Sequence, residues 1–192
     1  MEPIFKKQKV TVNGEKIITK TYFAQDVINP IHPGVLVMNN YHLRSVPIEV
    51  VSLVERSGNE YVIGGVYYDY DISLNLSAVY TFNHHTKVPI GDFKLAINNK
   101  GDKNEYYHEI PEVVLSWGNE KNVINQTSNG VTSSYLYNSK FFPIASIIGA
   151  KQDQVFYEWL EETENATEGS AKTGERYQNV GSYNFLTQGG FT

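Results

Sequence analysis

The pair Asn13-Gly14 constrains the fold of this chain more than any other short feature. Extended runs flank it on both sides, at Lys7–Val12 and Glu15–Phe23. Both central residues of a two-residue hairpin loop take positive φ, which Asn and Gly adopt at little cost. The pattern therefore predicts a two-stranded β-hairpin within residues 5–23.

The composition extends this prediction to most of the chain. Val and Ile together outnumber Leu and Ala two to one, and the chain has 14 Tyr. β-branched and aromatic side chains favour strands, whereas Leu and Ala favour helices. Short extended runs recur about every 8–12 residues, which is typical of all-β domains. We therefore predict a mainly β, single-domain fold over residues 1–164, a β-sandwich or barrel of about 9–10 short antiparallel strands.

A second hairpin is predicted around the turn at Arg56–Asn59. The runs Val46–Glu55 and Glu60–Val66 lie on either side of this turn. Gly64-Gly65 interrupts the second run. Glycine inside a strand indicates a bulge or a close approach of another part of the chain.

One helix is predicted, over residues 144–162. Apolar residues recur there at three- and four-residue spacing, and Pro143 stands just before them, where a helix tolerates proline. The apolar stripe consists of Ile144, Ile147, Ile148, Val155, Phe156, Trp159 and Leu160. Upstream, residues 26–47 contain three prolines; we expect a loop at Asn29–Gly34, followed by a short apolar run at Val35–Met38.

Residues 165–192 are predicted to form an extended C-terminal arm. The segment is rich in small and polar residues and carries apolar residues only at intervals. These residues are the expected anchors on a neighbouring surface: Tyr177, Val180, Tyr183, Phe185, Leu186 and Phe191. Extended segments with spaced anchors join subunits by filling pockets and grooves.

Charge is distributed unevenly between the two ends of the chain. The N-terminal segment is basic, with Lys6, Lys7 and Lys9, and the predicted helix is acidic, with Glu158, Glu161 and Glu162. Opposite charge at the two ends suits head-to-tail contacts between copies, which close into rings or continue as tubes. A solvated surface is the plainer interpretation of both patches.

Several classes of function are disfavoured by what the sequence contains. The chain has no cysteine, so disulfides and thiolate metal sites are excluded. The pI of about 5.5 argues against nucleic acid as the main ligand. No run is long enough for a membrane span, and no secretory signal precedes the first strand. His84-His85 is interpreted as a polar turn, and we predict no metal and no cofactor.

Two other functions remain open at this stage. Tyr67, Tyr70 and Trp117 could form a sugar-stacking platform beside Asp69 and Asp71, as in a carbohydrate-binding β-sandwich. The same two aspartates, or a histidine such as His108, could serve as acid and base in a β-rich hydrolase. The plainer interpretation is an exposed strand face with ordinary packing aromatics.

No motif of a known catalytic site is present, so the leading expectation is a non-enzymatic assembly protein. We expect its partners to be copies of itself and other subunits of a ring, tube or similar complex. A virion component of a tailed phage, in the tube, neck or head region, would have these general features; the analogy rests on them and not on a motif. The expected location is the virion or the host cytoplasm.

Overall fold

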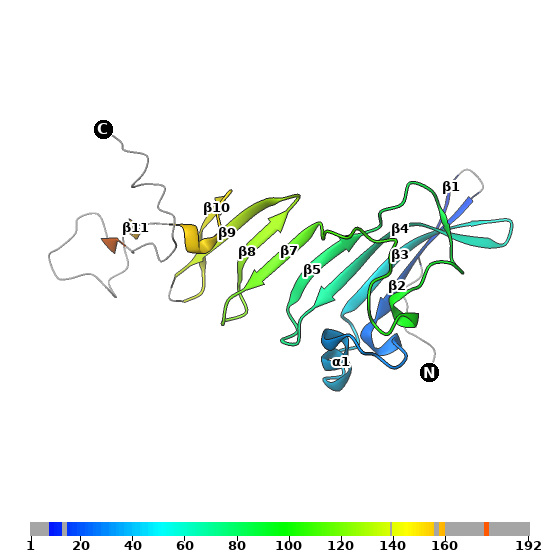
Figure 1. Cartoon of the computed structure of the whole chain (residues 1–192), viewed down its shortest axis with the longest axis horizontal. Helices are drawn as coiled ribbons and strands as arrows, with labels where there is room; N and C mark the ends of the chain where they lie inside the picture. Colours follow the sequence, from blue (N-terminus) through cyan, green and yellow to red (C-terminus); the bar gives the residue numbers. More distant parts are fainter. Residues whose placement is uncertain (1–7, 13–14, 139, 156–157, 160–174, 177–192) are drawn as a thin grey trace. The chain divides into compact units, whose positions relative to one another are not determined.

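The computed structural model describes residues 8–12, 15–138, 140–155, 158–159 and 175–176 (Figure 1). Backbone contacts divide the chain into two compact units, residues 1–115 and residues 116–192. The described residues are mainly β-strand with few helical turns, which confirms the predicted class. Among them, no helix is long and apolar enough to cross a membrane.

The first unit is built on an open antiparallel sheet. Its strands pair in chain order from β1 to β5, and β6 pairs with β4. β7 spans the boundary between the units, and its first residues pair with β5. The strands are β1 (Gln8–Val12), β2 (Glu15–Phe23), β3 (Pro47–Arg56), β4 (Asn59–Tyr70), β5 (Leu76–Thr81), β6 (Val88–Pro89) and β7 (Val113–Trp117).

Both predicted hairpins lie in this sheet. β1 and β2 pair in a register that sets Val12 opposite Glu15. The turn residues between them lie outside the described residues. β3 and β4 are joined through Ser57 and Gly58, whose φ angles are 51° and 81°. Two consecutive positive φ angles are the geometry of a tight hairpin turn that follows the twist of its strands.

The prediction for Gly64-Gly65 is confirmed. The pairing of β3 with β4 shifts between Ser52 and Leu53, where β4 holds one extra residue. Gly65 also allows a close approach, because a Cβ at this position would lie 2.9 Å from the Tyr107 hydroxyl oxygen. The glycines therefore serve both roles that the sequence left open.

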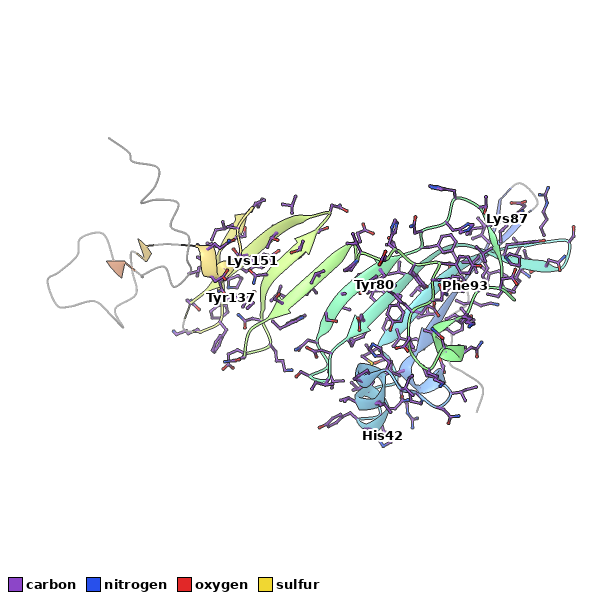
Figure 2. All side chains as sticks on the ribbon, viewed as in Figure 1. His42, Tyr80, Lys87, Phe93, Tyr137 and Lys151 are labelled. Carbon is purple, nitrogen blue, oxygen red and sulfur yellow. The ribbon has the colours of Figure 1, made fainter. Side chains whose placement is uncertain are left out.

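One face of this sheet is covered by loops and helical turns, not by a second sheet. The covering elements are α1 (Pro33–Asn40), η1 (Ala24–Asp26) and η2 (Ala96–Asn98), with the long segment of residues 82–112. Figure 2 labels Phe93 from this segment and Tyr80 from β5. The predicted sandwich or barrel is therefore wrong for the first unit, whose sheet stays open.

The loop predicted at residues 29–34 extends only to His32, because α1 begins at Pro33 and includes the apolar run Val35–Met38. Pro33 occupies the first turn of this helix, where a missing N–H costs nothing. Val35 and Met38 are three residues apart on one face of the helix and are buried in the core. The short apolar run was recognised in the sequence, but its helical state follows from packing on the sheet.

The second unit contains a three-stranded antiparallel meander. It consists of β8 (Val123–Ser128), β9 (Val131–Tyr137) and β10 (Pro143–Ile148). Asn129 and Gly130 join β8 to β9 with φ angles of 50° and 78°, a second tight turn of the same type. η3 (Gln152–Gln154) follows, and β11 (Glu158–Trp159) pairs with β12 (Glu175–Arg176).

The helix predicted over residues 144–162 is wrong across the part that is described. Residues 143–148 form β10, and Gly149 ends that strand with a φ of 89°. Ile144, Ile147 and Ile148 fit a helical stripe by spacing, but their β-branched side chains also favour a strand. Pairing with β9 decides between the two states, since it satisfies the backbone groups of both strands.

Candidate functional site

Glu49 lies at the centre of the first unit's core although it is ionisable. It stands opposite Tyr22 of β2 and Tyr67 of β4. Tyr67 in turn stands opposite Tyr80 of β5, so one row of four side chains crosses the covered face. The Glu49 side chain is 0% exposed.

The Glu49 carboxylate joins the sheet to the covering layer. It accepts a hydrogen bond from the backbone N–H of Ala96, with an N–O distance of 2.7 Å, and one from the Tyr107 hydroxyl, also at 2.7 Å. Burial raises the pKa of Glu49 to about 7, although both hydrogen bonds act in the opposite direction. No cation pairs with it among the described residues. The group therefore titrates near neutrality inside the core.

A perturbed pKa in a cleft is a common sign of catalysis, but Glu49 has no access to a substrate. A general acid or base must come within hydrogen-bonding distance of the group it protonates. Both Glu49 oxygens are already bonded to the protein, and the residue is sealed from solvent. Its geometry is that of a buried connection between layers.

A second polar junction holds α1 against β4. His32 precedes α1, and its Nε2 lies 3.1 Å from Oδ1 of Asp69. This hydrogen bond raises the pKa of His32 above its ordinary value, against the effect of burial. The Tyr67 hydroxyl donates to the carbonyl of Gly101 at 2.7 Å, and a Cβ at Gly101 would lie 3.0 Å from the Cβ of His32.

Within the described residues, this junction shows no hydroxyl group placed for attack. The Nδ1 of His32 is buried without a hydrogen-bond partner, so no hydroxyl nucleophile stands beside it. Asp71 accepts hydrogen bonds from the backbone N–H groups of Ser73 and Asn75, and it thereby closes the turn between β4 and β5. His108 is exposed.

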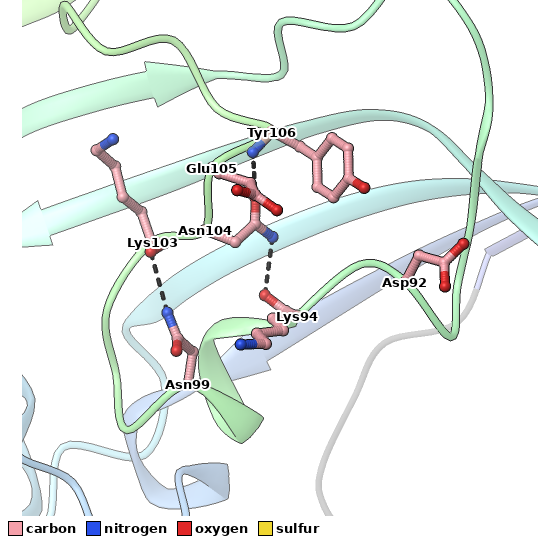
Figure 3. A pocket seen from close by; sticks show the side chains of 7 residues that line it. All are labelled: Asp92, Lys94, Asn99, Lys103, Asn104, Glu105 and Tyr106. Atoms are coloured by element: carbon pink, nitrogen blue, oxygen red, sulfur yellow. Dashed lines mark hydrogen bonds between the residues drawn. The ribbon is translucent and has the colours of Figure 1, made fainter.

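A surface hollow of about 200 Å³ lies along the covering segment (Figure 3). It is lined by Asp92, Lys94, Asn99, Lys103, Asn104, Glu105 and Tyr106. Two of its amide side chains are used internally, because Asn104 donates to the Lys94 carbonyl at 2.8 Å and Asn99 donates to the Lys103 carbonyl at 3.0 Å. Two lysines and two acids cancel in charge. The hollow is smaller than typical ligand pockets and favours neither anions nor cations.

The strands of the second unit show a different and more informative feature. No charged residue lies on β8, β9 or β10. β10 is the outer strand, and it pairs only with β9 among the described residues. Proteins normally protect such edges with charged side chains, because an unprotected edge offers free backbone groups to another strand. This edge lacks that protection.

Large apolar side chains are exposed around the same edge. Ile148 at the end of β10 is 77% exposed, and Phe142 and Phe141 just before the strand are 63% and 52% exposed. In contrast, only Ser134 and Leu136 are buried in the described residues of this unit. A small sheet that buries so little of its apolar surface gains stability when another surface covers it.

The predicted interaction residues fall mostly outside the described residues. Lys6, Lys7, Glu161 and Glu162 lie there, as do the six arm anchors. Lys9 belongs to β1 and Glu158 to β11, and only their backbone is described. The contact predicted between the two ends of the chain stays a prediction.

The sugar platform predicted as an alternative needed exposed tyrosines. Tyr67 is 2% exposed, and its hydroxyl is bonded to Gly101, so its ring offers no face to a ligand. Tyr70 packs partly buried against the core, and Trp117 belongs to the other unit. His84 is exposed and contacts Thr86, and no cluster of potential metal ligands occurs in the described ranges.

Sequence reasoning missed Glu49, His32 and the β10 edge. Glu49 had a signal, since it is a lone acid in the run Ile48–Val54, where burial was expected. The β10 edge had one too, because no charged residue occurs from Phe141 to Ala150, the stretch that holds β10. His32 had none, since its partner Asp69 is distant in sequence.

Comparisons with protein-family models, with curated proteins and with solved structures give no match to this chain. Function must therefore be argued from the chain's own geometry.

Proposed function

We propose that this chain is a non-enzymatic subunit of a larger protein assembly and that the second unit supplies a subunit contact through β10. One observation carries the proposal: β8, β9 and β10 bear no charge, and among the described residues the outer strand β10 pairs on one side only. A strand added to such an edge gains main-chain hydrogen bonds and covers exposed apolar side chains. The narrower prediction of a tailed-phage component rests on the sequence alone.

The contrast between the two units supports this assignment. The first unit's sheet carries ion pairs near its hairpin ends, at Lys16–Glu55 and Lys20–Glu60, and one of its faces is covered. The buried polar side chains of the first unit, Glu49 and His32, bond to other residues of the same unit. In the second unit β8, β9 and β10 carry no charged residue, and few of its described residues are buried, so this sheet has the properties expected of an interface.

Mass in solution tests the proposal. The full chain is examined by light scattering after size exclusion between about 1 and 100 µM, which spans the range where weak interfaces dissociate. We expect masses that are multiples of 21.8 kDa and that rise with concentration. Ser146→Lys places a charge in the middle of β10 and should raise the concentration of half-assembly at least about tenfold, which corresponds to about 1.4 kcal/mol.

The matched control is Ser116→Lys, the same change at an exposed position on β7, which should leave the assembly unchanged. A wild-type chain that remains at 21.8 kDa throughout the range would refute the proposal. Equal weakening by both lysines would show that charge in general, and not the β10 edge, controls the assembly.

The C-terminal arm is tested separately. Deletion of residues 170–192 removes β12 with the arm; it should leave the strands from β1 to β10 folded and reduce the size of the assembly, if the arm anchors on a neighbouring copy. Far-UV circular dichroism reports the folding, and light scattering reports the size. An unchanged assembly would remove the arm from the proposal and leave the β10 contact in place.

A further inference from the structure

We infer that Glu49 is a pH-sensitive latch for residues 93–107, the covering stretch that supplies both of its hydrogen-bond donors. When its carboxyl loses a proton to water, more molecules lift the covering stretch from the sheet while the strands stay paired. The inference concerns the first unit alone, so it goes beyond the proposed function and does not depend on it.

The covering stretch is held on the sheet mainly by side chains. It is described throughout, and its regular structure consists of η2 and one single-residue bridge. From the sheet, Glu49 bonds Ala96 and Tyr107, and Tyr67 bonds the carbonyl of Gly101. In contrast, β3 is paired with β2 on one side and with β4 on the other. Segments with few ladder bonds open at a lower free energy than central strands.

The two protonation states of Glu49 differ in charge but not in the number of bonds to the covering stretch. The ionised carboxylate accepts from the Ala96 N–H and from the Tyr107 hydroxyl. The protonated acid accepts from Ala96 and donates to the Tyr107 oxygen, because a hydroxyl serves as donor or acceptor. Only the ionised form leaves an unpaired charge in the core, which is unfavourable away from water. Lifting the covering stretch returns this charge to water, so ionisation favours the open form.

The surroundings of Glu49 supply no charge that would offset this cost. The titratable side chains in its row or bonded to it are tyrosines, whose pKa values burial raises: Tyr22 of β2, Tyr67 of β4, Tyr80 of β5 and Tyr107 of the covering stretch. The side chains that α1 adds to this core are apolar.

Charged side chains on the neighbouring elements are engaged with other groups. They are Lys20 of β2, bonded to Glu60 at 2.7 Å; Asp26 of η1, bonded to the Phe23 N–H at 3.0 Å; Asp69 of β4, 3.1 Å from His32; and Lys103 of the covering stretch, 4.9 Å from the centre of the Tyr80 ring. Among the described residues, Glu49 therefore has polar partners but no counter-charge.

The size of the effect follows from proton linkage. In the closed form, burial raises the pKa of Glu49 from 4.5 to about 7. The open form releases the proton at the ordinary pKa, so the ratio of open to closed molecules rises about tenfold per pH unit between these two values. The rise amounts to about 300-fold in all and levels off above about pH 7. Burial of Phe93, Leu95 and Tyr107 opposes opening at every pH.

Hydrogen exchange followed by mass spectrometry tests the latch on the full chain. Protection is the ratio of the intrinsic to the measured exchange rate, so it removes the ordinary effect of pH on exchange. Between pH 5 and 6.5, the protection of the covering stretch should fall about 30-fold. At each pH it should also be at least about tenfold below the protection of residues 48–54 of β3, because the strands stay paired.

Glu49→Gln is the matched control, because its amide cannot ionise but can keep both bonds. The protection of its covering stretch should change less than about threefold between pH 5 and 6.5. His32 lies beside the covering stretch and also titrates, but its raised pKa places its charge change above this range. Circular dichroism checks the fold of the variant. Tyr107→Phe is a second variant that keeps the acid, so its protection should be lower and should still fall with pH.

Each contrary outcome overturns a stated part of the latch. Equal protection of the covering stretch and β3 at every pH would show that the core opens only as a whole. A protection that stays constant from pH 5 to 6.5, or that falls equally in Glu49→Gln, would show that Glu49 does not control the opening. Loss of the pH dependence in Tyr107→Phe would lead to the same conclusion if Glu49→Gln does not fold.

Discussion

The buried carboxyl of Glu49 predicts a specific pH dependence of stability. Its pKa rises from 4.5 to about 7 on folding, because burial penalises the charged form. One pKa unit corresponds to about 1.4 kcal/mol, so the ionised group costs the folded state about 3 kcal/mol above pH 7. The residue is 0% exposed, so solvent does not screen this cost.

The sign follows from proton binding. Between pH 4.5 and about 7 the folded protein keeps the Glu49 proton while the unfolded chain releases it. The contribution of Glu49 to the free energy of unfolding is therefore highest below pH 4.5, falls as the pH rises, and levels off above about pH 7. Tyr22, Tyr67 and Tyr107, whose pKa values burial raises, stay neutral across this range.

Glu49→Gln isolates this effect. Its amide oxygen can accept from the Ala96 N–H, and its amide nitrogen can donate to the Tyr107 hydroxyl oxygen, so both connections survive. We expect the variant to equal the wild type within about 1 kcal/mol near pH 4.5 and to be about 2–3 kcal/mol more stable near pH 8. Urea unfolding followed by circular dichroism at several pH values gives these differences.

The comparison includes its own control. The pKa of His32 is also raised, so His32 contributes stability below pH 6.5 that is lost as the pH rises through its folded pKa. That contribution is common to both proteins and cancels in their difference. Glu49→Ala removes the acceptor and should destabilise the protein at every pH. A constant difference between Glu49→Gln and the wild type from pH 4.5 to 8 would refute the assigned titration.

Two further substitutions test the packing of the first unit in urea unfolding. Tyr67→Phe leaves the carbonyl of Gly101 without its donor and should cost about 1–2 kcal/mol, whereas no loss would mean that water replaces the hydroxyl. Gly34→Ala places a Cβ 2.0 Å from the carbonyl oxygen of Tyr70 and should cost about 3 kcal/mol or more. Gly91→Ala meets open space and should change stability by less than about 0.5 kcal/mol; equal effects of the two alanines would contradict the close contact.

The sequence predicted the features whose cause is local. Asn and Gly adopt positive φ at little cost, so hairpins could be inferred around Asn13-Gly14 and around Ser57-Gly58, whose φ angles are positive, without knowing what covers them. Gly64-Gly65 marked a bulge and a close approach because glycine has no Cβ. The excess of β-branched and aromatic residues correctly indicated a mainly β fold.

The candidate site could be predicted only in part. Two uncharged stretches, one with β8 and β9 and the other with β10, are visible in the sequence on either side of Lys140. Their meaning depends on which strand lies at the edge. His32 and Asp69 meet because α1 packs against β4, and no periodicity reports that contact. Glu49 stands out in its apolar run, yet its partners Ala96 and Tyr107 come from a segment far along the chain.

The residues around Ile144 show most clearly where sequence and tertiary structure divide. Their apolar spacing satisfies a helix and a strand equally, because residues three and four apart share a helix face while β-branching favours an extended chain. Only β9 alongside settles the matter, by bonding the backbone of β10 on one side. Local conformational preferences thus determined the turns and the strand class. The state of β10, the open sheet and the buried polar junctions required long-range contacts, because backbone and buried polar groups must find partners wherever the fold supplies them.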